Sequence, residues 1–176
     1  NKAIPNEEFP HENKSRIRNL DELQPVRKKS WSFNKLQNFI SLSASKQRLF
    51  VEAYFLLAVS RLLTFFFPFK QLAKLMGETK AESSNQINPL DVNKVREIGR
   101  GIKKASLYTP FRSLCFEQAL TVKFMLNRRK ISSTIYFGVA KETDVKLHAH
   151  AWTRAGNYFI TGNRGKELFT EISTFA

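Results

Sequence analysis

The stretch that decides the fold is residues 113–130, SLCFEQALTVKFMLNRRK, which carries the single cysteine of the chain. Residues 116–126 are largely apolar, which is typical of a helix buried on most sides. Ser113 is a candidate N-cap, because its hydroxyl can accept a hydrogen bond from a free backbone N–H at the start of the helix. The pattern therefore predicts a buried helix with Cys115 in its first turn.

A cysteine at this position has two interpretations. The free N–H groups at a helix start favour the thiolate, lowering the cysteine pKa from about 8.5, and they can also hold an oxyanion. Gln118, one turn further on, is a second candidate oxyanion donor. A lone cysteine on an apolar helix is otherwise a small core residue, so the choice depends on what lies near Cys115.

Three strands follow the helix in the sequence. Residues 131–140 are rich in β-branched and aromatic side chains and predict a buried strand. Residues 147–155 alternate in polarity, and the dipeptide Gly156-Asn157 predicts a tight turn into a return strand over 158–161. We expect an α+β fold, with N-terminal helices and a small antiparallel sheet packed on the cysteine helix.

The predicted hairpin carries two of the three histidines, in the segment LHAHAW at residues 147–152. A two-residue loop pairs Ala155 with Tyr158, and the same register pairs His150 with Asn163 on one face. A cysteine, a histidine and an asparagine that orients the histidine form a nucleophilic set. The register thus predicts Cys115, His150 and Asn163 as catalytic residues.

Other side chains near this set have alternative roles. His148 lies two residues before His150 on the same strand face, so the pair and Cys115 are a candidate metal set, but no fourth ligand is apparent. We predict no metal and no cofactor, and we place His148 at the rim of the site. Trp152 is a candidate substrate contact, with a core role as its alternative.

Taken in order, these motifs resemble the lasso-peptide leader peptidases, the transglutaminase-like cysteine proteases of ribosomal peptide (RiPP) biosynthesis. The resemblance covers roughly residues 36–176. The matching residues are Arg112-Ser113-Leu114-Cys115, Ala119-Leu120, Gly138-Val139, Ala149-His150-Ala151-Trp152 and Gly156.

This resemblance implies a transglutaminase-like, papain-like fold and a hydrolase that removes the leader from a precursor peptide. Cys115 would be the nucleophile and His150 the general base. The family commonly has an aspartate about a dozen residues after the histidine, whereas this chain has no aspartate after Asp144. Asn163 takes that place here. The implied partners are a leader–core precursor, a separate RiPP recognition element protein and an asparagine-synthetase-like lasso cyclase.

The chain divides into a polar extension, residues 1–35, and one peptidase domain, residues 36–176. A single cysteine excludes an internal disulfide and suits a reducing compartment. The start of the sequence has no signal-peptide pattern. Together these features predict a cytoplasmic protein.

The net charge is +14, from 29 basic and 15 acidic residues. Such a balance favours acidic partners, of which a leader peptide is one. No nucleic-acid-binding motif is present, so we predict no nucleic-acid partner. A basic nucleic-acid-binding protein and a non-catalytic peptide-binding scaffold of the same fold remain the rival functions.

Residues 49–69 are apolar enough to suggest a membrane span, but Glu52 and Arg61 interrupt them. A span needs about 20 apolar residues, and a charge near its centre costs about 2.5–3.5 kcal/mol. We therefore predict a helix packed on the core and ended by Pro68, with peripheral membrane contact or partner docking as alternatives. A linker over 77–89 follows, and Asp91 is a candidate N-cap for a helix over 92–107.

Overall fold

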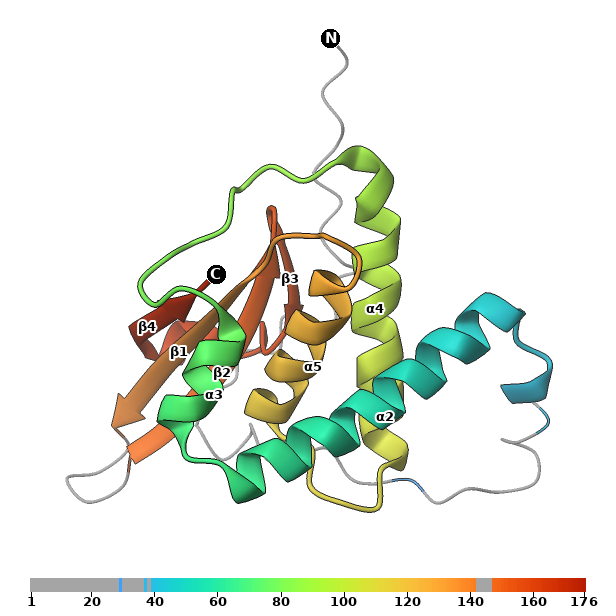
Figure 1. Ribbon diagram of the computed structural model, residues 1–176, viewed down its shortest axis with the longest axis horizontal. Coiled ribbons are helices and arrows are strands. Elements are labelled where there is room, and N and C mark those ends of the chain that lie inside the picture. The colour runs from blue at the N-terminus through green and yellow to red at the C-terminus, as the bar shows by residue number, and fades with distance from the viewer. Residues whose placement is uncertain (1–28, 30–36, 38, 142–146) are drawn as a thin grey trace, which may run out of the picture.

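The computed structural model describes residues 29, 37, 39–141 and 147–176 (Figure 1). Helices precede the strands in the chain and pack on a four-stranded antiparallel sheet, which confirms the predicted α+β class. Most of the predicted extension, 1–35, lies outside the described residues. The elements are α2 (Ala44–Phe66), α3 (Phe69–Met76), α4 (Pro89–Tyr108), α5 (Cys115–Asn127), β1 (Thr134–Lys141), β2 (Leu147–Ala155), β3 (Tyr158–Thr161) and β4 (Thr170–Phe175).

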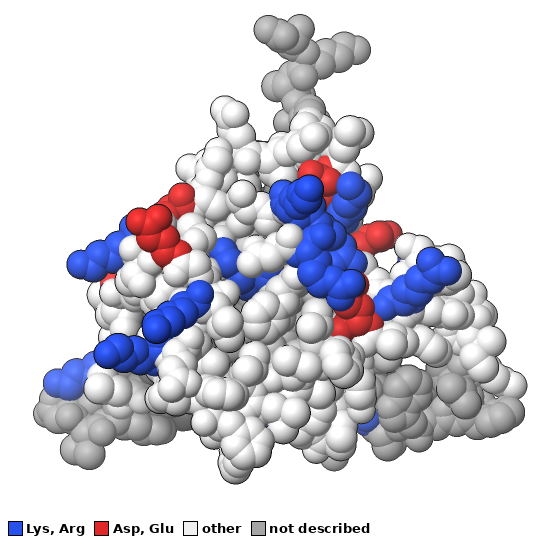
Figure 2. Space-filling view, in the orientation of Figure 1, with Lys and Arg blue, Asp and Glu red and all other residues white. Residues whose placement is uncertain are grey.

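Helix α5 is the centre of the molecule. Its residues Val122, Met125 and Leu126 pack in one core cluster with α2 and α4, and Ala119 and Leu120 pack in a second cluster with the sheet. Because α5 contributes to both clusters, it is buried on most sides, as the sequence predicts. The basic side chains lie in separate groups on the face shown in Figure 2, so the charge is not gathered in one patch on that face.

Two helices begin differently from the prediction. Leu114, rather than Ser113, is the N-cap of α5, since Ser113 is buried and its hydroxyl donates to the Ser106 carbonyl. In α4 the N-cap is Asn88, whose side chain accepts from a first-turn N–H, so the helix begins before Asp91. A proline at the first position of α4 suits this earlier start.

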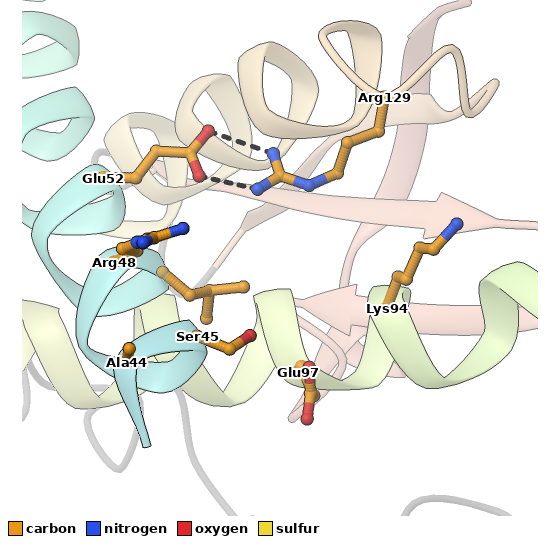
Figure 3. A pocket seen from close by; sticks show the side chains of 8 residues that line it. Ala44, Ser45, Arg48, Glu52, Lys94, Glu97 and Arg129 are labelled. Atoms are coloured by element: carbon orange, nitrogen blue, oxygen red, sulfur yellow. Dashed lines mark hydrogen bonds and ion pairs between the residues drawn. The ribbon is translucent and has the colours of Figure 1, made fainter. Parts of the chain in front are cut away.

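Helix α2 packs antiparallel to α5, and its two interrupting charges pair with α5 and with the residues directly after it. The contacts, from one end to the other, are Glu52 with Arg129, Ser60 with Thr121, and Arg61 with Glu117. Figure 3 shows the bidentate Glu52–Arg129 pair, with a shortest N–O distance of 2.6 Å. The predicted helix packed on the core is therefore confirmed, and it ends before Pro68 as expected.

The sheet has the strand order β3-β2-β1-β4. The predicted turn joins β2 to β3, and Ala155 pairs with Tyr158 as the two-residue loop requires. Gly156 has a φ of +54°, a left-handed conformation that glycine adopts without steric cost. The hairpin and its loop are thus confirmed.

The register beyond the loop differs from the prediction. A β-bulge between Thr153 and Arg154 pairs Thr153 with Thr161, one residue later than a regular register gives, and β3 ends there. The predicted pairing of His150 with Asn163 is therefore wrong. The physical reason is the extra residue on β3, which no pattern in the sequence marks.

Candidate active site

The fold brings the cysteine to the strand that carries the histidine. Cys115 is the first residue of α5, and its half-buried sulfur accepts a hydrogen bond from the backbone N–H of Ala151 in β2. Ala151 directly follows His150. The start of the cysteine helix therefore lies against the backbone next to the predicted base.

The groups around the Cys115 sulfur shift its pKa in opposite directions. Burial raises the pKa of Cys115, and the nearby Glu117 carboxylate also raises it. Backbone N–H groups of Ala151, Phe116 and Cys115 lower it, but burial prevails and the pKa lies above its ordinary value of 9.0. The predicted lowering of the pKa is wrong for the free protein. The resting group is a thiol, which needs a base before it can attack.

His150 is held in one tautomer by the backbone. Its Nε2 lies 2.8 Å from the Gly162 carbonyl oxygen. A carbonyl only accepts, so Nε2 carries the hydrogen and the neutral ring has its lone pair on Nδ1. Burial lowers the pKa of His150 below 6.5, against a smaller raising effect of the Gly162 bond, so the ring is neutral at pH 7.

Gly162 is the partner of His150 that the sequence analysis missed. Its φ is +70°, and a Cβ at this position would lie 2.2 Å from the Ala151 carbonyl oxygen. Only glycine fits so close to β2 in this conformation. The signal in the sequence is a glycine at the end of a strand, directly before the predicted Asn163. Asn163 itself is exposed, and its catalytic role stays a prediction.

Glu117 is the second missed residue. Its carboxylate accepts from the Leu114 backbone N–H at 2.9 Å and from Arg61 at 3.1 Å, while the residue is only 5% exposed. It thus fixes the loop that delivers Cys115 and adds negative charge near the sulfur. A glutamate three residues after the N-cap is a known helix-start signal, but it is recognised only when Leu114 is taken as the cap.

The remaining predicted residues lie near the site in supporting positions. Gln118 donates to the Ser113 carbonyl at 3.0 Å and so holds the same loop. Trp152 is 5% exposed, and its ring stacks on Tyr136, which confirms a core role. His148 is half-buried on β2, two residues before His150. The roles of these residues toward a substrate stay predictions.

The ring of His150 is enclosed by aromatic side chains. Its centroid lies 4.9 Å from that of Phe169 and 5.9 Å from that of Trp152. Trp152 lies on β2 with His150, and Phe169 comes directly before β4, so two parts of the sheet region meet at the imidazole. This enclosure removes water from the ring and accounts for the lowered pKa.

In the described part of the chain no group of three or more His, Cys, Asp or Glu side chains is placed to hold a metal ion. Two cavities of about 350 Å³ and 460 Å³ are present, and neither is lined by Cys115 or His150. The first lies between α2, α4 and the residues after α5 (Figure 3).

The sequence of the domain was compared with protein families. A family model of the transglutaminase-like superfamily matches residues 58–174, which include Cys115, His150 and Gly162. The chain belongs to the transglutaminase-like superfamily. This superfamily includes cysteine peptidases, in agreement with a thiol that contacts the backbone next to a histidine. No curated protein and no solved structure gives a significant match.

Proposed function

We propose that this transglutaminase-like protein is a cysteine peptidase that removes the leader from a lasso precursor peptide. The observation that carries the proposal is the contact of the Cys115 sulfur with the Ala151 N–H, directly beside His150. The tautomer of His150 adds support, because the ring nitrogen not held by Gly162 is the basic one. The order of motifs around these residues favours the leader peptidases within the superfamily.

In this proposal Nδ1 of His150 takes the thiol proton, and the sulfur forms a bond to the scissile carbonyl carbon. The resulting oxyanion accepts from the N–H groups of Cys115 and Phe116, which already point to the sulfur. Collapse of the intermediate breaks the C–N bond, and the imidazolium gives its proton to the leaving amine. Water then hydrolyses the thioester and restores the thiol.

Partners and location follow as parts of the same proposal. The substrate is a leader–core precursor presented by a separate RiPP recognition element protein in the cytoplasm. An asparagine-synthetase-like cyclase would then receive the freed core peptide. The net charge of +14 suits an acidic leader.

The test is leader release from a lasso precursor, followed by mass spectrometry with the recognition protein present. Cys115→Ala and His150→Ala are each expected to lose cleavage by at least about a hundredfold. Circular dichroism checks that both variants keep the fold. Cleavage by Cys115→Ala at the wild-type rate would exclude the mechanism.

The non-catalytic scaffold remains a second candidate, favoured by the raised pKa of Cys115. A reactive nucleophile is alkylated by iodoacetamide faster than a free thiol in the unfolded chain. Because the chain has one cysteine, the reaction reports on Cys115 alone. Alkylation no faster than that of the unfolded chain, together with no cleavage, would favour the scaffold.

A further inference from the structure

Helix α2 carries a second apolar face that the fold leaves uncovered. Its buried residues, Phe50, Ala53, Leu57 and Ser60, lie on one side, toward α4 and α5. Large side chains that are about half to two-thirds exposed lie on the other side and continue onto α3. These residues form the α2–α3 apolar surface: Val51, Phe55, Leu62, Phe65, Phe66, Phe67, Phe69 and Leu75.

The exposed side chains of α2 form a stripe. At about 100° per residue, the positions of Val51, Phe55, Leu62, Phe65 and Phe66 fall within about 100° of arc, opposite the buried side. A helix that is apolar all round is normally buried all round, and apolar patches of this kind mark interaction sites. The stripe is therefore a binding surface rather than a scatter of surface residues.

The charges of α2 and α3 suit an anionic occupant. Over residues 40–76 the chain has five basic residues and one acidic residue, Glu52, whose carboxylate is already paired with Arg129 and Arg128. The basic residues are Lys46, Arg48, Arg61, Lys70 and Lys74, of which Arg61 is already paired with Glu117. Figure 2 shows a mostly white surface where α2 lies in Figure 1, with basic side chains at its borders.

The helix is suited to lie on a membrane rather than to cross it. By length and composition α2 is long and apolar enough to span, and 22% of its most apolar window is buried in the fold. Crossing would break the Arg61–Glu117 and Glu52–Arg129 pairs and bring both charges into hydrocarbon. Lying in the interface keeps these pairs and buries only the exposed stripe.

From these observations we propose that the α2–α3 apolar surface binds an anionic lipid membrane. Phenylalanine and leucine enter the boundary of the acyl chains, while lysines and arginines beside them contact the headgroups. The surface reaches the candidate active site, because Phe69 packs against Phe116, the residue after Cys115. The centroids of the two rings lie 5.9 Å apart. A bound membrane would therefore lie next to the start of α5.

The test is co-sedimentation of the full chain with lipid vesicles. Vesicles of phosphatidylcholine mixed with phosphatidylglycerol are expected to bind the protein, and pure phosphatidylcholine to bind it at least about tenfold more weakly. The double variant Phe65→Ser/Phe66→Ser is expected to reduce binding to the mixed vesicles by at least about tenfold. Both rings are exposed and contact each other, so the fold should persist.

Leu90→Ser is the matched control, because Leu90 is 79% exposed at the start of α4, outside this surface. It is expected to bind as the wild type does. Equal binding of the double variant and the wild type would overturn the proposal. The proposal would also be overturned if the wild-type chain bound neither kind of vesicle and formed a dimer that the Phe65→Ser/Phe66→Ser variant does not form. A second copy of the chain would then cover the surface. This measurement does not depend on peptidase activity.

Discussion

Nε2 of His150 lies 2.8 Å from the carbonyl oxygen of Gly162, so a backbone group orients the imidazole where a side chain was expected. In nucleophilic triads the third residue fixes the tautomer and stabilises the imidazolium. The Gly162 carbonyl fixes the tautomer of His150, and it contributes in part to stabilising the imidazolium.

Gly162→Ala should disrupt both the fold and the site. The φ of +70° is unfavourable for alanine, and the new Cβ would meet the Ala151 carbonyl. We expect the free energy of unfolding to fall by about 2–4 kcal/mol, with loss of cleavage. Urea denaturation measures the first effect and the precursor assay the second. Unchanged stability would mean that the left-handed turn at Gly162 is not formed in solution.

Asn163→Ala separates the two candidates for the third position. Asn163 is exposed, and the Gly162 carbonyl already holds the ring. We therefore expect little change in stability and a fall in kcat of less than about tenfold. A loss of a hundredfold or more in kcat, with the fold intact, would restore Asn163 as the catalytic partner of His150.

Glu117→Gln should make Cys115 more acidic. The Glu117 carboxylate raises the pKa of the thiol, so its neutral amide is expected to shift the pH profile of iodoacetamide alkylation toward lower pH. The same variant weakens the bonds to Leu114 and Arg61, at a cost of about 1–2 kcal/mol in stability. Glu97→Gln, at an exposed position on α4, is the control. An unshifted profile would show that the charge of Glu117 does not reach the sulfur.

His150 should make stability depend on pH just below neutrality. Burial lowers its pKa, so the unfolded chain binds the proton more readily than the native one. This contribution is complete above about pH 6.5 and is lost as the pH falls from there through the folded pKa, with a slope of at most about 1.4 kcal/mol per pH unit. Urea midpoints between pH 7 and pH 5 measure it.

His150→Asn is expected to flatten that slope. Glu52 makes stability depend on pH in a lower pH range, because its hydrogen bond to Arg129 holds the pKa of that carboxyl below 4.5. Its contribution is present above that value and lost as the pH falls through the folded pKa. An unchanged slope in His150→Asn would show that the imidazole is not buried as described.

Local sequence patterns are enough to predict the buried cysteine helix, the three strands that follow it and the tight turn at Gly156. These features depend on local periodicity and turn chemistry, which act over a few residues. The same local signals placed Cys115 in a first turn and His150 on a strand. Family motifs then supported a transglutaminase-like fold.

The register beyond the hairpin and the protonation of the site depend on long-range packing, which local patterns do not contain. The bulge at Thr153 removes the predicted pairing of His150 with Asn163, and the imidazole instead bonds to the Gly162 carbonyl. The raised pKa of Cys115 likewise comes from burial among residues distant in sequence. Desolvation and strand register both depend on residues that are far apart in the sequence, so a local pattern does not predict them.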